Sequence, residues 1–119
     1  MKVIIVEDEI PAAEKLERYL QKYNADVQVL ARLQTVKDTI VWLEANQEKV
    51  DLIFMDIQLS DGLSFSIFRQ VAVRKPVIFT TAYNEFALDA FKVNSIDYIL
   101  KPITFTDLVA SLTKFASLR

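Results

Sequence analysis

The sequence predicts an α/β fold in which one sheet of five parallel strands is covered by helices on both faces. Two observations predict it: short apolar runs alternate five times with longer amphipathic stretches, and several of these runs end abruptly in charged or hydroxyl residues. Strands separated by helices run parallel with right-handed crossovers. We therefore expect a single domain over residues 1–119, a (βα)5 doubly wound flavodoxin-like sheet with strand order 2-1-3-4-5.

The strands are predicted from short runs rich in Val, Ile, Leu and Phe, which suit strands buried on both faces of a parallel sheet. The run that ends in Asp56 is expected to form the central strand. The five predicted strands are Lys2–Val6, Val27–Leu33, Asp51–Asp56, Val77–Thr80 and Ile96–Leu100.

The helices are predicted from apolar residues at helical spacing. Pro11 suits the first turn of the first helix, and Thr35 and Thr104 are predicted N-caps of the second and the last. The second helix is expected to stop near Asn46, and a weaker fourth helix is expected over Glu85–Val93. The predicted inward residues are Ala13, Leu16, Leu20 and Tyr23 in the first helix, Val36, Ile40 and Leu43 in the second, Phe65, Phe68 and Val71 in a short third, and Leu108, Leu112 and Phe115 in the last.

The composition excludes several kinds of chemistry. The chain has no cysteine and no histidine, which excludes disulfides, thiolate chemistry and a Ser-His-Asp triad. A formal net charge of -2 provides no basic field for nucleic acid or an anionic membrane. No apolar run is long enough to cross a membrane, and no secretory signal is present, so we expect a cytoplasmic protein.

Charged and hydroxyl side chains follow four of the predicted strands. Because parallel strands share one carboxyl edge, we expect Glu7, Asp8, Asp56, Thr81 and Lys101 to face one another there. Carboxylates so close together repel one another unless cations offset their charge. Lys101 supplies one positive charge, and Mg²⁺, which prefers oxygen ligands, is the predicted cofactor.

Such a site can transfer a phosphoryl group to a carboxylate. We predict that Asp56 attacks the phosphorus, while Asp8, helped by Glu7, holds the metal. The hydroxyl of Thr81 and the ammonium of Lys101 would each bind a phosphoryl oxygen. This chemistry requires no histidine in the chain.

The residues resemble the receiver domains of two-component response regulators over essentially the whole chain. The matching segments are VEDE at residues 6–9, DLIFMDIQL at 51–59, TTA at 80–82 and DYILKP at 97–102. The segment TTAYNEFALDAFKVNSIDYILKPI, residues 80–103, further resembles receivers joined to a LytTR-type DNA-binding domain, the LytR/AlgR family.

The resemblance implies that a sensor histidine kinase phosphorylates Asp56 in the presence of Mg²⁺, with Gln58 as a further metal ligand through its backbone carbonyl. It implies that Thr81 moves toward the phosphoryl group and that Tyr98 turns inward. The face of the fourth helix, last strand and last helix would then bind a partner or form a homodimer. The resemblance also implies a cis Lys101–Pro102 bond, and a signalling domain that assists its own phosphorylation and dephosphorylation and is not an enzyme in the usual sense.

Two features depart from the common receiver pattern. Glu7 stands where many receivers have Asp, a change that water-mediated contact with the metal tolerates. The loop after Asp56 is one residue shorter than usual, with Ser60 in place of a common proline, and contains Gly62, the only glycine of the chain. We expect Gly62 to mark its tightest bend because glycine accepts a positive φ.

The sequence disfavours two other functions known on the same fold. A phosphatase of the haloacid-dehalogenase type needs a second carboxylate where Gln58 stands, and a flavodoxin needs a phosphate-binding loop where Glu7, Asp8 and Glu9 stand. A receiver that binds its partner without phosphorylation is the other alternative. We expect the chain to be the N-terminal part of a longer regulator, so that DNA is bound only through a domain outside it.

Overall fold

The computed structural model describes residues 1–83, 90, 93 and 95–118. The helix predicted at Glu85–Val93 falls largely outside these described residues, and so do most of the contacts expected of the fourth helix. The segments that carry the predicted site residues are all described.

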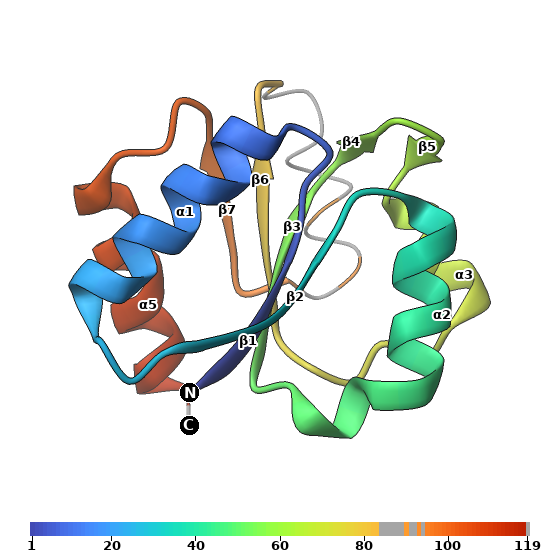
Figure 1. The fold of residues 1–119 in the computed structure, drawn as a ribbon, viewed down its shortest axis with the longest axis horizontal. Coiled ribbons are helices and arrows are strands. Elements are labelled where there is room, and N and C mark those ends of the chain that lie inside the picture. The colour runs from blue at the N-terminus through green and yellow to red at the C-terminus, as the bar shows by residue number, and fades with distance from the viewer. Residues whose placement is uncertain (84–89, 91–92, 94, 119) are drawn as a thin grey trace.

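A parallel sheet of five strands forms the centre of the molecule, in the order β2-β1-β3-β6-β7 (Figure 1). Because β6 and β7 are its fourth and fifth strands along the chain, the predicted order 2-1-3-4-5 is confirmed. Each predicted strand agrees with an observed one to within a residue. The strands are β1 (Lys2–Val6), β2 (Gln28–Leu33), β3 (Leu52–Asp56), β6 (Val77–Thr81) and β7 (Asp97–Leu100).

The described helices cover the two faces of the sheet in pairs. Helices α1 (Ile10–Tyr23) and α5 (Phe105–Ser117) lie on one face, and α2 (Val36–Asn46) and α3 (Phe65–Gln70) lie on the other (Figure 1). The hydroxyls of Thr35 and Thr104 accept hydrogen bonds from the third residue of their helices, so both predicted N-caps are confirmed. The predicted end of the second helix at Asn46 is confirmed, and a short 3₁₀ helix, η1 (Gln47–Lys49), follows it.

Two apolar clusters, one on each face, form the core. Phe54 and Ile78 belong to the cluster under α1 and α5, whereas Ile53 and Phe79 belong to the cluster under α2 and α3. Neighbouring residues of one strand thus point to opposite faces, as the pleat of a strand requires. All five residues of β3 are buried, so the strand that ends in Asp56 is enclosed by both helical layers.

Among the predicted inward-facing residues only Tyr23 was wrong, because the others are buried or pack against the core. Tyr23 is 38% exposed because it occupies the last position of α1, beyond the buried positions of that helix. In α3 the fully buried residue is Ile67, while Phe65 and Phe68 pack at the edge of the cluster. Val71 lies one residue beyond the end of α3 and is half-buried.

The loop after Asp56 contains an unpredicted antiparallel hairpin of strands β4 (Gln58–Leu59) and β5 (Gly62–Leu63). Gly62 has a φ of 142°, so the predicted glycine bend is confirmed. The carboxylate of Asp61, at the tip of the hairpin, accepts hydrogen bonds from the backbone N–H groups of Val36 (2.7 Å) and Lys37 (3.1 Å). The hairpin is therefore fastened to the N-terminus of α2.

None of the helices in the described part of the chain combines the length and the apolar character needed to cross a membrane.

Candidate functional site

Asp56 ends the central strand and lies at the carboxyl edge of the sheet. The residue is 5% exposed, and its neighbour Met55 is fully buried. Oδ1 of Asp56 accepts a long hydrogen bond, 3.4 Å, from the backbone N–H of Gln58. Burial of the preceding strand thus fixes the backbone that carries this carboxylate.

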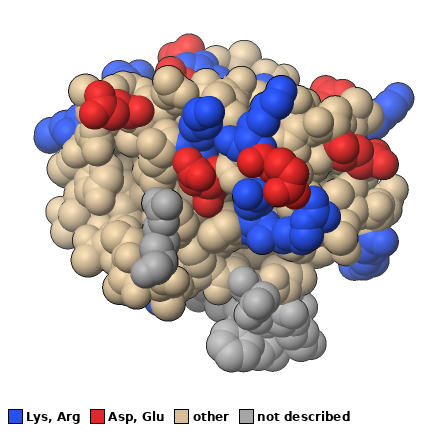
Figure 2. Space-filling model, turned by 90° about the horizontal axis from the view of Figure 1, so that it is seen from below, with Lys and Arg blue, Asp and Glu red and all other residues tan. Residues whose placement is uncertain are grey.

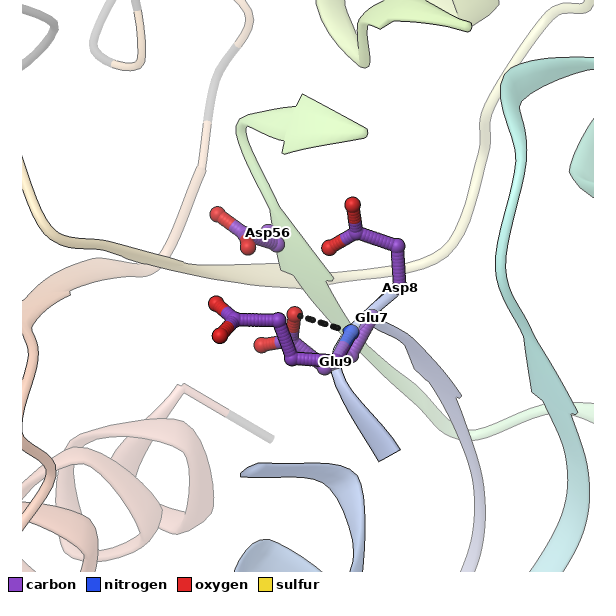
Figure 3. A group of neighbouring side chains, drawn as sticks. All are labelled: Glu7, Asp8, Glu9 and Asp56. Atoms are coloured by element: carbon purple, nitrogen blue, oxygen red, sulfur yellow. Dashed lines mark hydrogen bonds between the residues drawn. The ribbon is translucent and has the colours of Figure 1, made fainter. Parts of the chain in front are cut away.

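Three further acidic residues, Glu7, Asp8 and Glu9, follow β1, which is the neighbour of β3 in the sheet. Together with Asp56 they present carboxylate oxygens that all lie within 4.8 Å of one another. Figure 3 shows the side chains of Asp8, Glu9 and Asp56 around a common space at the end of the two strands. The predicted convergence of Glu7, Asp8 and Asp56 is therefore observed.

Glu9 belongs to this acidic cluster although the sequence reasoning gave it no role. Its side chain is 71% exposed, whereas that of Glu7 is 5% exposed. The backbone N–H of Glu9 donates to Oε2 of Glu7 at 3.1 Å. The signal that was available in the sequence is the unbroken acidic run Glu7-Asp8-Glu9 at a strand end.

Lys101 reaches the acidic cluster from the other side, directly after β7. Its Nζ lies 2.5 Å from Oε1 of Glu7, 2.9 Å from Oδ2 of Asp56 and 3.7 Å from Oε1 of Glu9. The backbone N–H of Lys101 donates to the carbonyl of Thr81 at 2.7 Å, which continues the β6–β7 pairing to the edge of the sheet. One cation therefore faces four carboxylates.

Burial changes the pKa of one acid of the cluster. Burial, assisted by the nearby charge of Asp56, raises the pKa of Glu7 from 4.5 to about 7, although the hydrogen bond from Lys101 opposes this shift. For Lys101, desolvation by burial acts to lower the pKa, but hydrogen bonds to Glu7 and Asp56 outweigh it and hold the pKa above 10.5. Lys101 therefore stays charged, whereas Glu7 holds a proton more readily than an ordinary carboxyl.

The donor set of the cluster suits a hard divalent cation. Its ligand atoms are carboxylate oxygens, which Mg²⁺ prefers, and no nitrogen or sulfur ligand lies among them. The cluster sets four carboxylates against the single ammonium of Lys101, so its charge is negative when the acids are ionised. The residues present thus fit the predicted magnesium ion.

Thr81 and Tyr98 are connected through the backbone of Tyr83. The buried hydroxyl of Thr81 accepts a hydrogen bond from the N–H of Tyr83 at 3.2 Å. The hydroxyl of Tyr98 donates to the carbonyl of the same residue. Tyr98 lies opposite Phe79 in the β6–β7 pairing, and its half-buried ring packs against the cluster under α2 and α3.

The remaining predicted positions are also described. Gln58 is exposed at the start of β4, two residues after Asp56. The peptide bond between Lys101 and Pro102 is cis, as predicted. A cavity of about 360 Å³ adjoins the acidic cluster, and Glu7, Lys101 and apolar side chains such as Leu16 line it.

Comparison with known proteins gives consistent matches over most of the chain. The family model of the response regulator receiver domain matches residues 3–113. The sensory transduction protein LytT of Bacillus cereus is 36% identical over 118 residues, which cover 97% of this chain and 47% of LytT. The transcriptional regulatory protein YpdB of Escherichia coli is 35% identical over 96% of this chain and 47% of YpdB. The chain thus spans about half the length of these relatives.

Solved structures agree with this result. The response regulatory domain of the protein MrkE from Klebsiella pneumoniae superposes with a TM-score of 0.84 at 35% identity, covering 99% of this chain and 97% of that domain. The similarity to LytT also confirms the resemblance to receivers of the LytR/AlgR type. From its fold, its sheet-edge residues and these matches, the chain belongs to the family of response regulator receiver domains.

Proposed function

We propose that Asp56 is the phosphoacceptor of this receiver and takes its phosphoryl group from a phosphohistidine of a sensor histidine kinase. A carboxylate oxygen of Asp56 forms the new bond to phosphorus, while the bond from phosphorus to the imidazole nitrogen breaks and that nitrogen takes up a proton. The observation that carries this proposal is the position of Asp56, which shares the sheet edge with three other acids and lies 2.9 Å from Lys101.

Lys101 and Thr81 are proposed to bind the transferred group. The ammonium of Lys101 already contacts Asp56, so a small shift would bring it to a phosphoryl oxygen on that residue. The hydroxyl of Thr81 lies at the same edge of the sheet and can donate a hydrogen bond to another phosphoryl oxygen. Both groups stabilise charge that develops on the equatorial oxygens.

Glu7, Asp8 and Asp56, with the backbone carbonyl of Gln58, are the proposed magnesium-binding residues. The ion, when bound, would offset the charge of the carboxylates and of the incoming phosphoryl group. The crowding of four carboxylates in one cluster supports this assignment. Glu9 is exposed and is placed to add a water-mediated contact.

Tyr83 is proposed to connect phosphorylation to the output face. If the hydroxyl of Thr81 turns to a phosphoryl oxygen, it gives up the hydrogen bond from the N–H of Tyr83. The carbonyl of Tyr83 accepts a hydrogen bond from the hydroxyl of Tyr98. A movement of Tyr83 that follows the change at Thr81 therefore also moves the acceptor of Tyr98. We propose that Tyr98 then turns inward and that the face of the fourth helix, β7 and α5 forms a homodimer.

The receiver is proposed to be the N-terminal part of a cytoplasmic transcription regulator with a LytTR-type DNA-binding domain. Supporting this proposal, LytT and YpdB are about twice as long as this chain, and YpdB is a transcriptional regulatory protein. The net charge of -2 leaves DNA binding to another domain.

The exposed Leu100 of β7 offers apolar surface on the proposed dimer face.

Phosphorylation can be tested with acetyl phosphate and Mg²⁺, followed by intact-protein mass spectrometry. We expect one acid-labile phosphoryl group on the wild-type protein and none on Asp56→Asn. Asp51→Asn is the matched control, because Asp51 lies at the opposite end of the same strand and accepts from the N–H of Lys2.

Other outcomes would support the alternative functions. Labelling of Asp56→Asn would refute the assignment of the phosphoacceptor. An unlabelled wild-type protein that still binds its partner would indicate a receiver that acts without phosphorylation. Sustained turnover of a small phosphate ester would indicate a phosphohydrolase.

A further inference from the structure

A second cavity, of about 540 Å³, lies at the opposite edge of the sheet from the acidic cluster. The described part of its wall comes from the segment before β6, the segment before β7 and the last turns of α5. Phe68, Val73, Ile96 and Phe115 contribute apolar surface to it. A cavity of this size, with a wall that is part apolar and part polar, lies within the range of small-ligand sites.

Three cations, Arg74, Lys75 and Lys114, line the same cavity. Arg74 pairs with Glu48, and Nζ of Lys75 lies 3.9 Å from the same carboxylate, which is 73% exposed. Lys114 makes no ion pair with any residue that the structure describes. The described lining thus holds three cations and no carboxylate, so the cavity is cationic in a protein whose net charge is -2.

Figure 2 shows this end of the molecule, where Lys and Arg side chains gather around a few acidic ones beside a largely uncharged surface. The side chain of Lys75 is only 25% exposed, so its stem covers neighbouring atoms of the cavity wall. Attraction between charges is stronger beside an apolar, partly dehydrated wall than in open water. The cavity therefore favours a ligand that combines an apolar body with negative charge.

We propose that this cavity binds a small organic anion, an apolar chain or ring that carries one carboxylate or phosphate group. The apolar body contacts Ile96 and Phe115, and the anionic group lies between Lys75 and Lys114. Ile96 precedes Tyr98 by two residues, and Phe115 lies in α5. The ligand would thus contact two elements of the proposed output face from the end opposite Asp56, as a second input to the receiver.

Binding can be measured on the unphosphorylated, metal-free protein. Because this test does not depend on phosphorylation of Asp56, a failure to bind the ligand is distinguishable from a failure of the proposed function. We would titrate the ¹⁵N-labelled protein with octanoate and, separately, with 1-octanol, which has the same chain but no charge. We expect saturable shifts of the amides of Ile96, Lys114 and Leu118 with octanoate. Octanol should bind about tenfold more weakly, because it lacks the attraction to the cations.

Variants identify the cations that are responsible. The double variant Lys75→Ala/Lys114→Ala should bind octanoate about tenfold more weakly than the wild-type protein. Lys37→Ala, an exposed cation of α2 outside the cavity, is the matched control and should leave the affinity unchanged. Equal affinities for octanoate and octanol would overturn the proposal. So would no saturable shift at millimolar octanoate, shifts confined to the cavity beside Leu16, or an affinity that the double variant does not change.

Discussion

Nζ of Lys101 lies 2.9 Å from Oδ2 of Asp56, a residue 45 positions earlier in the chain. The same nitrogen also contacts Glu7, so a single lysine bridges carboxylates from two adjacent strands. If Asp56 is the phosphoacceptor, this lysine is the only described cation that contacts both the nucleophile and the acidic residues after β1. The contact leads to the first prediction.

Lys101→Ala should slow phosphorylation of Asp56 by acetyl phosphate about 100-fold, the usual cost of losing one preorganised donor to developing charge. The rate can be followed by intact-protein mass spectrometry at saturating Mg²⁺. Lys15→Ala is the control, because Lys15 lines the cavity beside the acidic cluster but makes no ion pair with its carboxylates among the described residues. An unchanged rate in Lys101→Ala would show that the ammonium does not contact the reacting group.

The stability of the metal-free protein should fall as the pH rises from about 5 to about 8. Folded Glu7 keeps its proton up to about pH 7, because burial and Asp56 raise its pKa, whereas the unfolded chain releases this proton near 4.5. The folded state therefore binds more protons between these values, and its advantage is lost as the pH passes through about 7. Thermal unfolding in EDTA would report the change as a falling Tm.

Glu7→Gln is the control for this pH dependence, since its amide cannot titrate and has a similar shape. The Tm of that variant should change less between the two pH values than the Tm of the wild-type protein. Parallel curves for the two proteins would mean that Glu7 titrates alike in the folded and unfolded chain.

Asp61→Ala should destabilise the protein by about 1 kcal/mol, the typical cost of removing a helix cap. The substitution removes both acceptors for the N–H groups of Val36 and Lys37, which begin α2. Thr35 caps only the next N–H, that of Asp38, so it does not replace them. Urea unfolding would measure the loss, and Asp61→Asn, which keeps one acceptor, should lie between the two proteins.

The main sheet and the edge residues could be predicted from the sequence because each leaves a local pattern. The run that ends in Asp56 shows a buried strand, and its end fixes where the carboxylate lies. The hairpin of Gln58–Leu59 with Gly62–Leu63 could not be predicted, because strands of two residues leave no periodic pattern. Its only local sign was Gly62, whose positive φ was expected.

Contacts between distant segments were also beyond reach from the sequence. The capping of α2 by Asp61 joins residues that are 25 and 24 positions apart, and nothing in either segment indicates the other. The connection of Thr81 to Tyr98 through the backbone of Tyr83 likewise required coordinates. Glu9 is part of the acidic run in the sequence, but only the coordinates show that its carboxylate lies close to that of Asp56.

The two halves of the site differ in how firmly the sheet holds them. Glu7, Asp8 and Glu9 follow β1 and Asp56 ends β3, and each of these strands has a neighbour on both sides. Lys101 follows β7, a strand of four residues that pairs only with β6 among the described strands. Outer strands open more readily than inner ones. Transient fraying of β7 would withdraw the counter-ion and leave the carboxylate of Asp56 in place. If Asp56 is the phosphoacceptor, a partner that binds this edge strand would change the rate at which it is phosphorylated.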